Sequence, residues 1–213
     1  MHDDFPCAPG GLLLPGPVGR LEAITSCPDT ERRPPATAVI CHPHPQHDGT
    51  MHNKVVHTLA RAFELAGARS LRFNFRGVGQ SEGVFGDSVG ETEDAIAVLE
   101  WVRERRPGDE LWLAGFSFDA AAALRAATSF PVARLITVAP AVHLYPDLAD
   151  LELPEIPWLL AMGTADEVVP PGIVQDWARS RRHPPTLVLH EGVGHFYHQR
   201  LPELREAVLR HIA

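Results

Sequence analysis

Short apolar runs alternate with helix-like segments along most of this chain. The continuous apolar run at 36–41 is typical of a strand that is buried on both faces. After it, residues 53–66 place Val55 and Leu59 on one helical face, and Gly67 marks the end of that helix. Pro and Gly residues bound two short strands before this unit, near 11–14 and 19–25. The same patterns predict later strands near 68–75, 111–114, 133–139, 156–162 and 185–190, and later helices near 91–105, 119–128, 172–180 and 202–212.

This alternation of strands and helices predicts an α/β fold, with a mainly parallel central sheet covered by helices on both faces. Ligands of such sheets bind at the carboxyl ends of the strands. A chain of 213 residues that is 45% hydrophobic suffices for one globular domain spanning residues 1–213. We find no linker, repeat or low-complexity tract that would divide it.

The composition of the chain argues against nucleic acid and membrane partners. A formal net charge of −8 and the lack of a basic stripe argue against nucleic acid. The first residues are acidic where a signal peptide would be basic, and no apolar run approaches membrane-spanning length, so we expect no membrane partner. Cys7, Cys27 and Cys41 are odd in number and widely spaced, which predicts reduced thiols and a cytoplasmic location. The sequence does not indicate an oligomeric state.

The stretch around Ser117 carries the first candidate chemistry. An apolar run at 111–114 ends at Gly115, and an alanine-rich segment begins after Asp119. This order predicts a strand that turns abruptly into a helix and presents the Ser117 hydroxyl at the apex of the turn. The N–H of Phe118 would then lie at a helix N-terminus, where it can stabilise an oxyanion. The alternative interpretation is a serine that merely caps the helix.

Two later strand ends supply a carboxylate and an imidazole. Asp166 follows the strand near 156–162, and His195 follows the strand near 185–190. A neutral serine is a poor nucleophile, so an imidazole must take its proton and a carboxylate must orient that imidazole. The chain order Ser, Asp, His belongs to one known arrangement of this triad.

In these residues the chain resembles an α/β-hydrolase of the small, lidless, dienelactone-hydrolase-like kind. The resemblance extends from residue 36 to the C-terminus. It implies a three-layer α/β sandwich without a lid domain, with Ser117 as nucleophile, His195 as general base and acid, and Asp166 as the orienting carboxylate. The matching segments are Cys41-His-Pro-His-Pro45, residues 49–56, residues 72–83, the turn at Ser117, Asp166-Glu-Val-Val-Pro170 and Gly194-His195-Phe.

The resemblance also implies an oxyanion hole built from backbone N–H groups. Phe118 would supply one N–H, and the loop after residue 41 would supply the other. A gapless match points to His44, with Gln46 as the alternative. Pro43 and Pro45 have no N–H and are excluded.

Each triad assignment has a rival nearby. Glu167 stands beside Asp166 and could be the working acid, and Asp166 could simply cap the next helix. His198 competes with His195, but Gly194 permits the tight turn that would aim His195 back at the sheet. We expect His198 at the start of the final helix.

The pocket is expected to be shallow and open. Only residues 140–155 separate two strands at the point where α/β-hydrolases usually insert a lid, and this is too short for a lid domain. Small or flexible acyl groups would suit such a pocket. Leu144, Tyr145 and Trp158 are the nearest apolar candidates to line it.

Two further features allow other interpretations. Arg76, after a strand end, is expected to hold its loop together with Ser81 and Glu82, and it could instead bind an acidic substrate. Asp119 departs from the family pattern Gly-x-Ser-x-Gly, which has glycine at that position. It could be a solvent-facing acid in the first helical turn, or a charge that opposes the oxyanion and weakens the enzyme.

The histidine-rich loop at 42–48 suggests a metal hydrolase as the sharpest alternative. His42, His44, His47 and Asp48 nearly match the ligand pattern of metallo-β-lactamases, but Gln46 stands where an acid should be. A metal site also leaves the turn at Ser117 unexplained.

The sequence therefore predicts a serine hydrolase of the carboxylesterase type that cleaves small esters through an acyl-enzyme. We expect no metal and no organic cofactor. A thioesterase or lactone hydrolase with the same triad is the alternative within enzymes, and a weakly active or non-catalytic binding scaffold is the alternative outside them.

Overall fold

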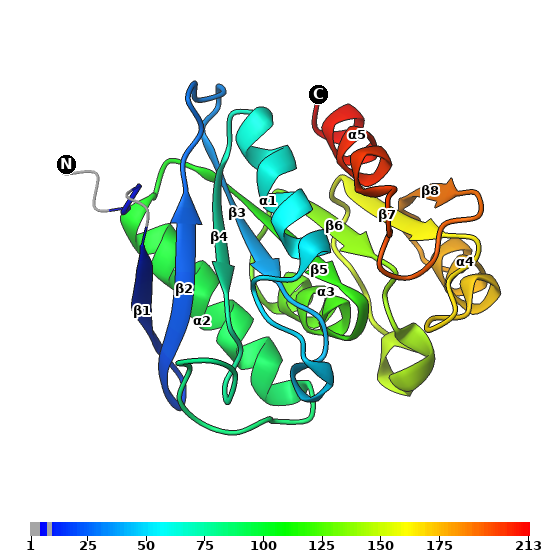
Figure 1. The fold of residues 1–213 in the computed structure, drawn as a ribbon, viewed down its shortest axis with the longest axis horizontal. Helices are drawn as coiled ribbons and strands as arrows, with labels where there is room; N and C mark the ends of the chain where they lie inside the picture. Colours follow the sequence, from blue (N-terminus) through cyan, green and yellow to red (C-terminus); the bar gives the residue numbers. More distant parts are fainter. Residues whose placement is uncertain (1–4, 8–9) are drawn as a thin grey trace.

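The computed structural model describes residues 5–7 and 10–213, and within them eight strands form one sheet (Figure 1). The strand order across the sheet is β1-β2-β4-β3-β5-β6-β7-β8. The two pairs β1–β2 and β2–β4 are antiparallel, and each later neighbour pair is parallel. The strands are β1 (Gly11–Gly16), β2 (Gly19–Ser26), β3 (Ala36–Cys41), β4 (Arg69–Phe73), β5 (Glu110–Phe116), β6 (Arg134–Val138), β7 (Trp158–Gly163) and β8 (Thr186–His190).

Helices connect the parallel strands and cover the sheet. In Figure 1, α1 and α5 lie together on one face, and α2 and α3 lie on the other. This is the layered α/β architecture that the alternating pattern predicts, so the expected fold class is confirmed. The α-helices are α1 (Lys54–Leu65), α2 (Val89–Arg105), α3 (Ala120–Ser129), α4 (Pro171–Arg179) and α5 (Leu201–Ile212). The short 3-10 helices are η1 (Pro45–His47), η2 (Ser117–Asp119), η3 (Val142–Leu144) and η4 (Pro146–Ala149).

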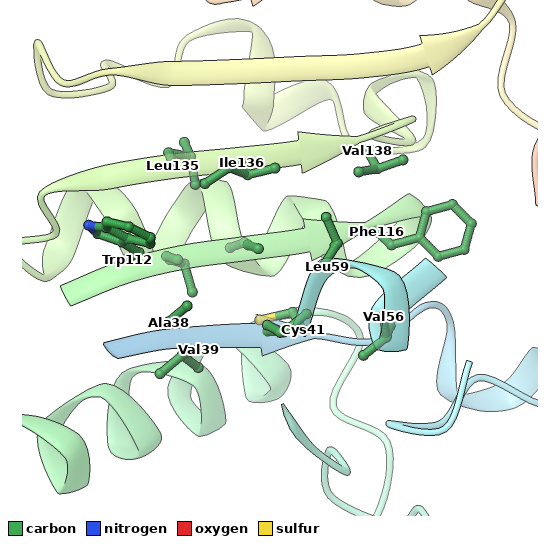
Figure 2. Packing of buried hydrophobic residues seen from close by; sticks show 14 of the residues in the cluster. Ala38, Val39, Cys41, Val56, Leu59, Trp112, Phe116, Leu135, Ile136 and Val138 are labelled. Carbon is green, nitrogen blue, oxygen red and sulfur yellow. The ribbon is translucent and has the colours of Figure 1, made fainter. Parts of the chain in front are cut away.

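The core lies where the central strands meet the helices. All residues of β3 and β7 are buried, which is why these strands read as continuous apolar runs rather than as alternating ones. Figure 2 shows Val56 and Leu59 of α1 over the carboxyl-end half of the central strands, on the side of Phe116, whereas Trp112 lies at the other end of β5. Burial of this apolar surface is the main driving force that holds the layers together.

Several element boundaries differ by one or two residues from those predicted, and two of these differences have local reasons. β4 ends at Phe73 because the N–H of Phe75 donates to Nε2 of His42 rather than to a strand carbonyl, although the N–H of Asn74 still donates to the carbonyl of Glu22 in β2. α2 begins at Val89 because the Glu91 carboxylate accepts a hydrogen bond from the N–H of Ser88, 2.7 Å away, and so caps the helix from its first turn.

The prediction of three reduced thiols is wrong for two of them. Cys7 and Cys27 form a disulfide, with Cα atoms 5.5 Å apart, and Cys41 is free and buried. The cause is the β1–β2 hairpin: Cys7 precedes β1, Cys27 follows β2, and antiparallel pairing brings these two ends together. The thiol argument for a cytoplasmic location therefore does not hold.

The connection between β6 and β7 is short. It contains η3 and η4 and no inserted domain, in agreement with the lidless arrangement. Separately, we find no helix among residues 5–7 and 10–213 that is both long and apolar enough to cross a bilayer.

Candidate active site

Ser117 lies at a sharp turn between β5 and α3. Its φ is +60°, a left-handed conformation that is uncommon for a residue with a side chain. The turn brings α3 so close to β5 that a Cβ on Gly115 would lie 2.7 Å from the Cα of Ala120. Glycine at 115 is therefore required by the close approach of helix and strand. The N–H of Ala141 donates to the carbonyl of Ser117 and holds the turn from the next strand end.

Three side chains from separate strand ends form one hydrogen-bonded chain. The Nε2 atom of His195 lies 2.8 Å from the Ser117 hydroxyl, and its Nδ1 lies 2.8 Å from Oδ2 of Asp166. His195 is 2% exposed and its ring stacks on Phe116 at 4.9 Å between centroids. The structure thus brings together the three residues predicted as nucleophile, general base and orienting carboxylate.

Backbone groups fix the carboxylate and the imidazole. The second oxygen of Asp166, Oδ1, accepts the N–H groups of Val168 and Val169 at 2.9 and 2.7 Å. The rival acid Glu167 instead accepts the backbone N–H of His195 at 3.2 Å. Asp166 therefore orients the ring, whereas Glu167 supports the loop that carries it. The rival base His198 is exposed and precedes α5, rather than standing in its first turn.

The loop after β3 lies against the turn at Ser117. The ring of His44 packs on the ring of Phe118, with centroids 3.7 Å apart. The N–H of Gln46 donates to Nδ1 of His44 at 3.1 Å, so this alternative oxyanion donor is already engaged within the loop. Gly49 closes the loop tightly, since a Cβ there would lie 1.8 Å from the carbonyl oxygen of Pro43.

A cavity of about 310 Å³ opens beside the Ser117 hydroxyl. Val168 and Phe196 line this cavity and were not predicted to do so, although each lies within two residues of a predicted triad member. The full lining consists of Pro43, His44, His47, Asp48, Gly49, Asn53, Ser117, Val168, His195 and Phe196. A larger cavity of about 470 Å³ lies between 149–153 and 180–183 and contains none of the three triad side chains.

None of the three predicted pocket residues lines the cavity at Ser117. Trp158 points into the core, where its indole N–H donates to the hydroxyl of Thr137 at 3.0 Å. Tyr145 packs against the ring of Phe118, and Leu144 is exposed in η3. The expectation was wrong because it took the short connection after β6 as the pocket wall. The walls come instead from the loops after β3, β7 and β8.

His42, the first residue of the histidine-rich loop, has a structural role. His42 is fully buried, its Nδ1 lies 2.6 Å from the carbonyl of Pro43, and its Nε2 accepts the N–H of Phe75 at 3.1 Å. Both ring nitrogens are therefore committed, and burial lowers the pKa of His42 to about 4. In the part of the chain that the structure describes, no group of three His, Cys, Asp or Glu side chains is arranged to hold a metal ion.

The family model described as serine aminopeptidase, S33, matches residues 33–154, which is more than half of the chain. The chain belongs to this family of α/β hydrolases. It is also 32% identical over 207 residues to an uncharacterized protein of Rickettsia prowazekii, a match that covers 92% of this chain and 86% of that protein. The family and the fold indicate a serine hydrolase.

Solved structures agree with this assignment. An α/β serine hydrolase homologue from Coxiella burnetii is 44% identical, with a TM-score of 0.94 over 99% of this chain and 100% of that one. A lidless α/β serine hydrolase from Xanthomonas campestris is 43% identical, with a TM-score of 0.91 over 98% of this chain and 96% of that one. The expected lidless α/β-hydrolase fold is thereby confirmed.

In this hydrolase Arg76 is a structural residue, but not with the predicted partners. Its guanidinium binds Asp94 of α2 through Nε and Nη2, at 3.0 and 2.7 Å, and contacts Glu93 at 3.1 Å. Ser81 donates instead to the carbonyl of Asn74. Because Arg76 is buried and paired, it is not free to bind an acidic substrate.

Asp119 does not face solvent as a first-turn acid would. It is 0% exposed, and neither carboxylate oxygen has a hydrogen-bond partner among the described residues. Burial raises the pKa of Asp119 well above its usual value, the nearby Glu91 and Asp94 raise it further, and Arg125 opposes them. The uncharged acid is therefore favoured, and the charge that would oppose an oxyanion is disfavoured.

Proposed function

We propose that this protein is a serine hydrolase of the carboxylesterase type that cleaves small esters through an acyl-enzyme on Ser117. The observation that carries the proposal is the continuous chain of hydrogen bonds from the Ser117 hydroxyl through His195 to Asp166. A buried imidazole in this position takes the serine proton as the hydroxyl attacks, and the carboxylate stabilises the imidazolium that forms.

The ester carbonyl would lie at the mouth of the cavity beside Ser117. The tetrahedral oxyanion would be bound by the N–H groups of Phe118 and His44, since the N–H of Gln46 is engaged elsewhere. His195 then donates its proton to the leaving alcohol. In the second half-reaction the same ring takes a proton from water, which cleaves the acyl-enzyme.

The shape of the site favours small acyl groups. The cavity at Ser117 measures about 310 Å³, and no domain covers it. Pro43, Val168 and Phe196 give it an apolar wall that suits a short hydrocarbon chain. A thioester or lactone presents the same carbonyl chemistry to the same three side chains, so these substrates stand as alternatives for the one mechanism.

Hydrolysis of p-nitrophenyl acetate by matched acid variants tests this proposal. Asp166→Asn should lower kcat by roughly 10³ to 10⁴, because the amide can no longer hold His195 in the required tautomer. Glu167→Gln removes the neighbouring charge and should cost far less, since Glu167 supports only a backbone N–H. Equal losses in the two variants would contradict the assignment of Asp166. A wild-type enzyme that cleaves amino-acid p-nitroanilides but not the ester would overturn the substrate class.

A further inference from the structure

A second cavity adjoins the one at Ser117. It measures about 410 Å³ and is lined by His52, Asn53, Lys54, Phe196 and His198. Asn53 and Phe196 line both cavities, so the two adjoin at these residues, and we call the two together the groove. We call the part beyond Phe196 the outer cavity.

The outer cavity differs from the inner one in charge. Its lining includes Lys54 and the imidazoles of His52 and His198, and no carboxylate. The inner cavity includes Asp48 and no lysine or arginine. The groove thus has its carboxylate near the reacting serine and its ammonium group at the far end, with imidazoles in both parts.

Lys54 has no ion-pair partner among the residues that the structure describes. The chain has one lysine, this one, and 27 acidic residues against 19 lysines and arginines. Most arginines of the described chain form ion pairs, yet Lys54 forms none within residues 5–7 and 10–213. An exposed ammonium at a cavity wall, in a chain with excess acid, is available to an anionic ligand.

We infer that the outer cavity binds a carboxylate at the distal end of the substrate, so that the preferred substrates are half-esters of dicarboxylic acids. This inference rests on the proposed ester hydrolysis at Ser117. The ester carbonyl would lie at Ser117, the methylene chain would cross the half-exposed Phe196 ring, and the carboxylate would meet Lys54 and the two histidines. Arg76 cannot take this role, because Asp94 and Glu93 already hold its guanidinium.

Matched ester pairs test the inference. One pair consists of the p-nitrophenyl half-ester of adipic acid and p-nitrophenyl hexanoate, and a second uses the corresponding eight-carbon acids to cover a longer reach. The readout is the ratio of kcat/KM for the charged ester to kcat/KM for the neutral one. Lys54→Gln should lower this ratio roughly threefold to fivefold, the effect of losing one partly screened charge pair. Lys54→Arg keeps the positive charge and should retain most of the wild-type ratio.

Arg61→Gln is the control. Arg61 lies on the same helix α1, is exposed and pairs with Glu64, and the same net charge is lost. If the ratio falls equally in Arg61→Gln, the effect is one of net charge and the outer cavity is not the anion site. A ratio that Lys54→Gln leaves unchanged for both pairs also overturns the inference.

The Ser117→Ala variant separates a failure of the anion site from a failure of the proposed ester hydrolysis. If Ser117→Ala cleaves both esters of a pair as fast as the wild type does, the proposed function itself is wrong. If cleavage depends on Ser117 but the ratio ignores Lys54, only the anion site is rejected. In the wild type the ratio should fall as salt rises to about 0.5 M, because exposed charges are screened over a few ångströms there.

Discussion

The Nε2 atom of His42 accepts a hydrogen bond from the backbone N–H of Phe75, 3.1 Å away. His42 follows β3 and Phe75 follows β4, so this bond joins the carboxyl ends of two neighbouring parallel strands beneath the loop that carries His44. The other ring nitrogen lies 2.6 Å from the carbonyl of Pro43. His42 is therefore a neutral ring that donates from Nδ1 and accepts at Nε2.

Stability should fall with acid because of His42. Its pKa is lowered from 6.5 to about 4 in the folded state by burial. Above pH 6.5 both states hold a neutral ring. Between 6.5 and 4 the unfolded chain binds a proton that the folded chain does not, so stability falls as pH falls, by up to about 3 kcal/mol.

Urea unfolding of wild type and His42→Leu at pH 7.5 and pH 4.5 measures this effect. At the higher pH the variant should be less stable by about 2 to 4 kcal/mol, because the buried N–H of Phe75 and carbonyl of Pro43 lose their partner. The gap should narrow at the lower pH. His143→Leu, at an exposed position in η3, is the control for removing one histidine. If wild type and His42→Leu differed in stability by the same amount at both pH values, the pKa of His42 would not be lowered in the folded state.

Asp119 should have the opposite effect on stability. Because its pKa is raised in the folded state, the unfolded chain ionises first as pH rises, and stability is lost through that window. Asp119→Asn keeps the shape and removes the titration. The free energy of unfolding of the variant relative to wild type should therefore increase by about 1.4 kcal/mol per pH unit within the window.

Urea unfolding of both proteins between pH 4 and pH 8 checks this slope. Asp150→Asn, at an exposed position, controls for the exchange of aspartate for asparagine. A stability difference that does not change with pH would show that Asp119 titrates alike in both states, and would restore the ionised carboxylate near the oxyanion site.

The sequence predicts much of the fold because its signals are local. The strand at 36–41 is a nearly continuous apolar run and is found with those bounds, since burial on both faces leaves no exposed position. The triad could be selected because parallel strands bring their carboxyl ends to one edge of the sheet. Ser117, Asp166 and His195 meet there, as the positions of their strands require.

The features that were not predicted depend on contacts between distant segments. Arg76 binds Asp94 of α2, and nothing local to either residue identifies the other. The pairing of Cys7 with Cys27 requires the register of the β1–β2 hairpin. The burial of Asp119 follows from how α3 packs against its neighbours, which a helical pattern alone does not specify.

The proposed mechanism requires the Ser117 hydroxyl to act as the nucleophile of an acyl-enzyme. Labelling of the native protein with a fluorophosphonate probe, followed by peptide mapping, tests it most directly, because the probe bonds only to an activated serine. We expect one modified peptide with the label on Ser117, no label in Ser117→Ala, and a loss of ester hydrolysis in that variant by roughly 10³ or more. Label on another serine, or near wild-type hydrolysis by Ser117→Ala, would contradict it.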